Sequence, residues 1–419
     1  MMKATNSNIN NKITIIGAGI SGLITAIELE KLGFSPIIIE ASDCVGGRVK
    51  TDIVEGFQLD HGFQVLLEAY PKAKKYLNYK TLELQKLVPG AVIYKNGKTN
   101  LIGDPLRDFS LFVPTLLAKV GSIKDKLAIF KLNLELKNKS IEAIFNDEQQ
   151  STLQYLEDKG FSDRIIQNFF KPFFTGIFLE TDLRTSSAMF QFTYKMFGEG
   201  LALIPKEGVQ AIPNQLKSQL TKTVFKFNTK VKSVEEKRII LEDDSVISSD
   251  IIIIATDASR ILGLEKPIAW KSCDTLYFEV EQNTLKNPII GLLADKDALI
   301  NNIFYTTSIA NNNISKEQLL SVTIVKNHNL DEADLISRIK TELKNKCGII
   351  TKRFIKRYSI KKALPDLEHL DYFGSDEKFL FSDTIYLAGD TMLNGSLNAA
   401  MTSGEIVAQL IGERFLNSL

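Results

Sequence analysis

Two glycine-containing segments near opposite ends of the chain carry the residues best suited to hold a nucleotide. The first, Gly17–Gly22, follows the apolar run Ile13–Ile16 and has G-x-G-x-x-G spacing. Gly17 allows a tight turn, Gly19 lets the backbone approach a pyrophosphate, and Gly22 lets a helix pack closely on the strand. The N-terminus of that helix would face the phosphates. The predicted pyrophosphate cradle consists of Gly17, Ala18, Gly19, Ile20, Ser21 and Gly22.

An acidic residue follows at a suitable distance. Glu40 ends an apolar strand, close to the spacing of about 20 residues at which a carboxylate contacts ribose hydroxyls. A carboxylate there disfavours a 2′-phosphate, so NADP fits poorly. Gly46 and Gly47 would let the backbone pass close to the cofactor, while Arg48 offsets pyrophosphate charge; an exposed arginine in an ordinary loop is the alternative. We therefore assign Glu40, its neighbour Ala41, and Gly46 to Arg48 to the cofactor site.

The second segment indicates that one long cofactor is held from both ends of the chain. The apolar strand Thr384–Leu387 leads into Ala388, Gly389 and Asp390. A dinucleotide long enough to reach both segments is expected to be FAD, and the protein is therefore predicted to be a flavoenzyme. There is no second G-x-G-x-x-G in the sequence, which argues against a separate NAD(P)H site. Oxygen, a quinone or another acceptor would then take the electrons from the reduced flavin.

The elements that position these residues begin with one βαβ unit. The apolar spacing predicts a helix over Ile20–Lys31, with Gly33 as its stop signal and Pro36–Glu40 as the next strand. Further along, the pattern predicts strand over Thr223–Glu235, and Ile251–Thr256 is a buried apolar run.

Together these motifs resemble those of the FAD-dependent amine oxidoreductase superfamily, which includes monoamine oxidases, protoporphyrinogen oxidases and plant-type phytoene and ζ-carotene desaturases. The resemblance covers most of the chain and is most specific in the FAD-binding segments. It implies an α/β fold with a Rossmann-like FAD-binding domain and a discontinuous α+β substrate domain. The implied FAD-binding domain spans residues 1–70, 201–270 and 376–419, and the substrate-binding domain spans 71–200 and 271–375.

The resemblance also assigns roles in the second half of the chain. It implies that Val231 contacts the adenine through its backbone, and that Asp390 contacts the ribityl or pyrophosphate region. Ser396, Leu397 and Asn398 would lie where a helix N-terminus faces the pyrimidine edge of the flavin and stabilises the negative charge of its reduced form. A plain capped C-terminal helix is the alternative for that segment.

One departure from the family pattern bears on the substrate. Amine oxidases of the superfamily place an aromatic residue just before the C-terminal helix, whereas Ser396 occupies that slot here. No cysteine is present there for a covalent flavin link, so we expect non-covalent FAD. Leu397 and Met401 favour an apolar ligand over a simple amine. Flavin chemistry requires no protein nucleophile or metal, and His61 is a candidate base whose alternative role is packing or flavin contact.

The expected reaction is hydride transfer from an organic substrate to flavin N5. The leading hypothesis for the substrate is an apolar isoprenoid-type molecule, which the enzyme would dehydrogenate. An amine or protoporphyrinogen oxidase that uses oxygen is the first alternative, and a flavin-dependent non-redox isomerase is the second. A set of aromatic residues in the substrate segments forms either plain core or an apolar tunnel. These are Phe169, Phe170, Phe173, Phe174, Phe178, Phe190 and Phe192.

Composition limits the number of domains and the kinds of partner and site that the chain can have. A chain of 419 residues is too long for one ordinary core, so two domains are expected. With 51 basic and 50 acidic residues the net charge is +1, which argues against a nucleic-acid partner. Three cysteines and three histidines without ligand spacing predict neither a disulfide framework nor a metal site. No signal peptide or membrane span is visible, so we expect a cytoplasmic protein; the oligomeric state is not indicated.

The segment Phe109–Leu136 leaves one further alternative open. It combines apolar clusters with Lys119, Lys124, Lys126 and Lys131. This pattern is typical either of a solvated helical face or of a helix that lies on a membrane surface.

Overall fold

A six-stranded sheet with the order β10-β2-β1-β14-β21-β20 is assembled from three distant pieces of the chain. The computed structural model describes residues 11–105 and 107–416. The strands that run parallel are, in sheet order, β10 (Val224–Lys226), β2 (Ile37–Ile39), β1 (Ile13–Ile16), β14 (Ile251–Ile254) and β21 (Ile385–Leu387). An antiparallel edge strand, β20 (Leu380–Ser382), completes the sheet.

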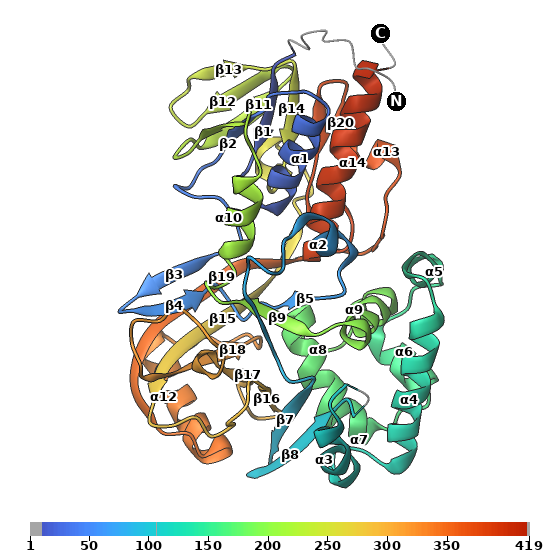
Figure 1. The fold of residues 1–419 in the computed structure, drawn as a ribbon, viewed down its shortest axis with the longest axis vertical. Helices are drawn as coiled ribbons and strands as arrows, with labels where there is room; N and C mark the ends of the chain where they lie inside the picture. Colours follow the sequence, from blue (N-terminus) through green and yellow to red (C-terminus); the bar gives the residue numbers. More distant parts are fainter. Residues whose placement is uncertain (1–10, 106, 417–419) are drawn as a thin grey trace.

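Both faces of this sheet are covered, which explains its isoleucine-rich strands. Helices α1 (Ile20–Lys31) and α14 (Leu397–Leu416) pack side by side on one face (Figure 1). On the face that these helices cover, alternate strand residues such as Ile15 belong to the same hydrophobic cluster as the helix residues. On the other face, the intervening residues such as Ile16 pack against a β-meander. That meander comprises β11 (Val231–Glu235), β12 (Arg238–Leu241) and β13 (Val246–Ser248).

A second, seven-stranded sheet lies at the other end of the molecule (Figure 1). In sheet order its strands are β19 (Thr351–Asp366), β15 (Ala269–Val280), β18 (Gln318–Ile324), β17 (Ile300–Tyr305), β16 (Ile290–Leu293), β7 (Gly90–Lys95) and β8 (Lys98–Gly103). Helix α12 (Glu332–Glu342) contributes Leu335 and Ile339 to its core.

A group of helices stands beside this second sheet (Figure 1). In chain order they are α3 (Phe112–Leu117), α4 (Ile123–Asn138), α5 (Ile141–Asn146), α6 (Thr152–Asp158), α7 (Asp163–Ile165), α8 (Lys171–Phe178) and α9 (Ser187–Glu199). A π-helical turn, Ile166–Phe170, joins α7 to α8. No helix within the described ranges is both long and apolar enough to cross a bilayer.

Short elements connect these parts. They are the hairpin β3 (Thr51–Val54) and β4 (Phe57–Asp60), the small sheet of β5 (Leu66–Leu67), β9 (Ala202–Pro205) and β6 (Leu84–Lys86), and the helices α2 (Pro71–Tyr76), α10 (Ala211–Ser218), α11 (Ala258–Ile261) and α13 (Asp376–Phe379). Strand β9 pairs with β5 on one side and β6 on the other, so this small sheet ties neighbouring parts of the chain together.

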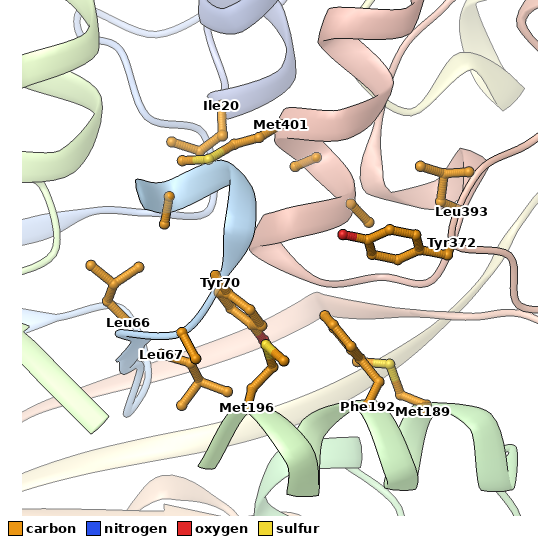
Figure 2. Packing of buried hydrophobic residues seen from close by; sticks show 14 of the residues in the cluster. Ile20, Leu66, Leu67, Tyr70, Met189, Phe192, Met196, Tyr372, Leu393 and Met401 are labelled. Atoms are coloured by element: carbon orange, nitrogen blue, oxygen red, sulfur yellow. The ribbon is translucent and has the colours of Figure 1, made fainter. Parts of the chain in front are cut away.

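One hydrophobic cluster runs without a break from the six-stranded sheet into the helical group. Figure 2 shows its middle, where Ile20 of α1 and Met401 of α14 lie above Tyr70, with side chains of α9 below. The rings of Tyr70 and Phe192 stack with centroids 5.7 Å apart, and Tyr372 lies 5.9 Å from Phe192. The six-stranded sheet and the helical group therefore share one core.

Both ends of α4 are fixed by buried polar contacts. The carboxylate of Asp125 accepts hydrogen bonds from the backbone N–H and the hydroxyl of Ser122, at 2.6 and 2.7 Å, and from the same groups of Ser162, both at 2.8 Å. At the other end, Lys195 Nζ donates to the carbonyl of Leu136 at 2.8 Å. A capping box and a cation at the C-terminus both favour the helix.

We predict that Asp125→Asn lowers the free energy of unfolding by about 2 kcal/mol at pH 7, because charge-assisted hydrogen bonds are lost. Burial acts to raise the pKa of Asp125, but the hydrogen bonds from Ser162 and Ser122 hold it below its ordinary value. A depressed pKa contributes stability above the unfolded-state pKa of about 4, and this contribution is lost as the pH falls through the folded-state value.

Urea denaturation of both proteins at a series of pH values checks this expectation. The difference between them should shrink in acid. Asp163→Asn, at an exposed position, is the control and should change stability by less than about 0.5 kcal/mol. Equal stability of Asp125→Asn and the wild type at neutral pH would contradict the prediction.

Candidate functional site

The carboxyl ends of four parallel strands meet at one edge of the six-stranded sheet. Gly17 follows β1, Glu40 follows β2, residues 255–257 follow β14, and residues 388–390 follow β21; all of them line one cavity. Ligands of open α/β sheets bind at this edge. The cavity encloses about 1100 Å³, whereas pockets for one small ligand hold roughly 300–1,000 Å³. It is therefore larger than the usual pocket for one small ligand.

The three glycines of the first motif differ in their surroundings. Gly17 has φ +106°, and a Cβ there would lie 2.9 Å from the carbonyl oxygen of Ala255. A Cβ on Gly22 would lie 2.1 Å from the carbonyl oxygen of Gly17, so only glycine permits this contact between helix and strand. Gly19 lines the cavity, and a Cβ there would meet nothing within 4 Å. The open space above Gly19, at the N-terminus of α1, fits a pyrophosphate.

Glu40 links the glycine turn to the loop that follows β2. Its Oε2 accepts a hydrogen bond from the N–H of Ala18 at 2.7 Å, and its Oε1 accepts from the N–H and hydroxyl of Ser42 at 2.9 and 2.8 Å. The carboxylate keeps further acceptor capacity for ribose hydroxyls, since its two oxygens offer about four lone-pair sites. The backbone N–H of Thr229 donates to the Glu40 carbonyl at 2.9 Å. The chain segment that leads into Val231 therefore lies beside the same loop.

Arg48 connects the glycine loops near the start of the chain to the segment that follows β21. The N–H of Gly46 donates to the Ala18 carbonyl at 2.9 Å, so the second glycine loop lies against the first. From this loop the Arg48 guanidinium forms an ion pair with Asp390 and a 3.2 Å hydrogen bond to the carbonyl of Ala363. The same guanidinium lies 5.2 Å from the centre of the Trp270 ring. The structure thus brings residues from both ends of the sequence together around one guanidinium.

The start of α14 is capped and points at the cavity. Ser396 Oγ accepts a hydrogen bond from the Ala399 N–H at 3.0 Å and donates to Asn394 Oδ1 at 2.7 Å. Ser396 and Leu397 line the cavity, whereas the buried side chain of Asn398 accepts a hydrogen bond from the Lys72 N–H at 3.0 Å. The predicted cofactor residues that do not line the cavity are Ala18, Gly22, Ala41, Val231 and Asn398.

His61 lines the cavity and is held by two neighbours. Its Nε2 lies 2.8 Å from Asp52 Oδ2, and the Tyr358 hydroxyl donates to the same oxygen at 3.0 Å. The imidazole also lies over the Tyr358 ring, with centroids 4.3 Å apart. Burial acts to raise the pKa of Asp52, but hydrogen bonds from His61 and Tyr358 hold it below its ordinary value. Asp52 therefore stays ionised and orients the imidazole.

The aromatic set of the helical group divides into two. Phe169 and Phe173 line the cavity, together with Tyr194 and Phe197 of α9. The remaining members are fully buried behind them: Phe170, Phe174, Phe178, Phe190 and Phe192. Five members of the set are therefore core, whereas Phe169 and Phe173 face the cavity.

Three features of the site were not anticipated from the sequence. Residues 255–257 contribute a fourth strand end. The run Ala-Thr-Asp after an apolar strand resembles the Ala-Gly-Asp of residues 388–390, so the sequence did hold a usable signal for it. Trp270 lies between two cations, since Lys362 Nζ is 5.7 Å from its ring and forms a 2.5 Å ion pair with Asp257. No sequence pattern pointed to Trp270 or Lys362.

Comparisons with known proteins agree on one family. Its model, described as flavin containing amine oxidoreductase, matches residues 20–412. The 15-cis-phytoene desaturase of Solanum lycopersicum is 25% identical over 316 residues, which are 67% of this chain and 52% of that protein. In eight of the curated relatives, the matched stretches span between 7% and 58% of the relatives' own length.

Solved structures share the fold. An oxidoreductase from Methanosarcina mazei has a TM-score of 0.73 at 16% identity, covering 95% of this chain and 100% of that chain. A CLA-producing fatty acid isomerase from P. acnes has a TM-score of 0.72 at 16% identity, covering 96% of this chain and 98% of that chain. The α/β architecture expected from the sequence is thereby confirmed.

Two alanine substitutions separate folding from cofactor binding. Gly22→Ala should lower the free energy of unfolding by about 2 kcal/mol or more, because its Cβ collides with backbone. Gly19→Ala should leave stability within about 0.5 kcal/mol of the wild type. Its methyl group projects into the cavity, so FAD affinity should fall by about tenfold or more, equivalent to ~1.4 kcal/mol. Denaturation curves and flavin absorbance after dialysis measure the two effects; full flavin retention by Gly19→Ala would place the pyrophosphate elsewhere.

Proposed function

Because this chain belongs to the flavin-containing amine oxidoreductase family, we propose that it dehydrogenates an apolar, isoprenoid-type molecule by hydride transfer to FAD. Family membership confirms the predicted FAD cofactor and, as a reaction class, a flavin-dependent oxidoreductase. The apolar substrate is the finer proposal. It is carried by one observation, the continuous cavity that joins the glycine segments to the aromatic lining of α8 and α9.

The residues at the sheet edge would hold the cofactor. The turn from Gly17 to Ser21 fits the pyrophosphate, and Glu40 is placed to accept hydrogen bonds from a ribose. Arg48 supplies positive charge beside the phosphates, and its ion pair with Asp390 fixes the direction of the side chain. Ser396 and Leu397, at the start of α14, would lie at the flavin end, where a helix N-terminus favours negative charge. When bound, the flavin supplies the hydride acceptor.

The opposite half of the cavity determines what the site would oxidise. Phe169, Phe173 and Phe197 exclude water and favour an apolar ligand. The polar side chains Asn302 and Thr323 also line this half, but they hydrogen-bond to each other at 3.2 Å. These lining residues come from the pieces 71–200 and 271–375. Their origin supports our proposal that these two pieces form the substrate-binding domain. The pieces 1–70, 201–270 and 376–419 would then form the FAD-binding domain.

An amine is the less favoured substrate. The acidic side chain that lines the aromatic half, Asp104, forms an ion pair with Arg107 at 3.3 Å and so does not offer a lone carboxylate to an ammonium group. Ser396 caps α14 instead of placing an aromatic ring at that position. Protoporphyrinogen oxidation and a non-redox isomerisation fit an apolar cavity, and they differ from dehydrogenation in their products.

Purified protein should be yellow, and the flavin should bleach when an isoprenoid lipid extract is added without oxygen. Mass spectrometry should then find products that have lost two hydrogen atoms per cycle. Peroxide together with an aldehyde would instead indicate an amine oxidase, and a product of unchanged mass would indicate an isomerase. A colourless preparation that does not take up FAD would overturn the proposal.

A carboxylate placed in the apolar half should block substrate without displacing the cofactor. We predict that Phe169→Glu lowers kcat/KM by more than about tenfold, because an unpaired charge must be buried beside an apolar ligand. Flavin content should not change, since Phe169 lies away from the glycine segments. Lys171→Glu, two residues on and outside the cavity lining, is the control. Unchanged kinetics of Phe169→Glu would remove this half of the cavity from the substrate path.

A further inference from the structure

Helix α4 is apolar on two opposite sides. Leu132 and Leu136 are buried against the rest of the molecule. Ile123, Leu127, Phe130 and Leu134 instead point outward, with Ile123 70% exposed and Leu127 65% exposed. Their spacing of four, three and four residues places them in one stripe along the helix. A helix that only covers a core has one apolar side, so the outer stripe needs a separate explanation.

The neighbouring residues extend this stripe into a larger surface. Phe109 and four apolar residues of α3 are also exposed, and the rings of Phe109 and Phe112 stack with centroids 5.9 Å apart. Lys126 of α4 donates to the Leu116 carbonyl, which holds α3 against α4. We call this surface the apolar face: Phe109, Phe112, Val113, Leu116, Leu117, Ile123, Leu127, Phe130 and Leu134, all between 47% and 82% exposed.

The cavity reaches the apolar face. Phe109, Phe112, Leu116 and Phe130 belong to the face and also line the cavity. An opening rimmed by exposed apolar side chains suits a ligand that arrives from an apolar phase. Large contiguous apolar patches are rare on monomeric soluble proteins, so a patch of this kind indicates an interaction surface. Figure 1 places α3 and α4 at the end of the molecule away from α1 and α14. A flat partner could therefore cover the face without reaching the cofactor edge.

The charges around the face identify that partner. Lys119, Lys124 and Lys131 are exposed beside the stripe. The acidic residues of α4 are engaged elsewhere, since Asp125 is buried in the capping box and Glu135 accepts from Lys159 at 2.6 Å. A second copy of the chain would bring like charges together. Anionic lipid headgroups complement these lysines, and exposed apolar side chains enter the acyl boundary of a bilayer.

We propose that the apolar face docks the protein on an anionic membrane surface, so that the cavity opens toward the lipid. The route for substrate rests on the proposed function, because it assumes an apolar ligand, whereas the docking itself does not. The face lies on the surface of the bilayer, with Phe109, Leu117, Ile123 and Leu127 inserted and the lysines at the headgroups.

Vesicle sedimentation of the full-length holoenzyme tests the docking. The wild type should bind phosphatidylcholine vesicles that contain phosphatidylglycerol, and raised salt should weaken this binding. The triple variant Ile123→Glu, Leu127→Glu and Leu134→Glu, at positions that do not line the cavity, should lower partitioning by more than about tenfold. The matched control is Ile53→Glu with Ile314→Glu and Ile350→Glu, which adds the same number of charges at residues that are 66%, 82% and 52% exposed outside the face, and it should bind like the wild type.

Three outcomes would overturn the proposal. These are a wild type that binds no vesicles, a triple variant that binds like the wild type, and wild-type self-association that the triple variant abolishes in the absence of vesicle binding. Flavin content and circular dichroism confirm that the variants fold. Turnover of a detergent-dissolved apolar substrate is measured separately, so that vesicle binding without dehydrogenation would reject the proposed function and leave the docking in place.

Discussion

The site depends on the alignment of three parallel strands that lie more than a hundred residues apart in the sequence. Strand β14 sits between β1 and β21, with Ile16 opposite Ile254 and Ile254 opposite Leu387. The next hydrogen bonds, from Ala255 N–H to the Ile16 carbonyl and from Ala388 N–H to the Ile254 carbonyl, are both 2.9 Å long. The three strands therefore end level, and Gly17, Ala255 and Ala388 enter the cavity side by side. A shift of one residue would turn each strand's side chains to the opposite face.

Close helix packing reinforces this alignment. Gly404 of α14 approaches α1 so closely that a Cβ there would lie 2.6 Å from the Ser21 carbonyl oxygen. Gly389 N–H donates to Ser403 Oγ at 2.9 Å, which ties the end of β21 to the same helix. The N-termini of α1 and α14 thus approach the cavity together. Two helix ends directed at one cavity suit a cofactor that carries negative charge at more than one place.

Local patterns could be predicted from the sequence, and long-range placement could not. The helix Ile20–Lys31 has the bounds expected from apolar spacing and from Gly33, because those signals lie within a few residues of the helix. The run Thr223–Glu235 instead contributes to two different sheets, with Asn228 at φ +51° between them. The spacing in the sequence places Phe169 and Phe173 on a different helix face from Phe170 and Phe174. It does not indicate which of the two pairs faces a cavity. The π-helical turn Ile166–Phe170 also changes the register at which α8 begins.

The continuous core between α1, α14 and α9 limits how the molecule can move. In many enzymes of two lobes, a hinge opens the cleft to exchange ligands and closes it for reaction. Here the stacked rings of Tyr70 and Phe192 and the methionines around them fill the space between the lobes (Figure 2). Swinging the lobes apart would hydrate those rings, so exchange of a bound molecule must proceed through side-chain rearrangements along the passage.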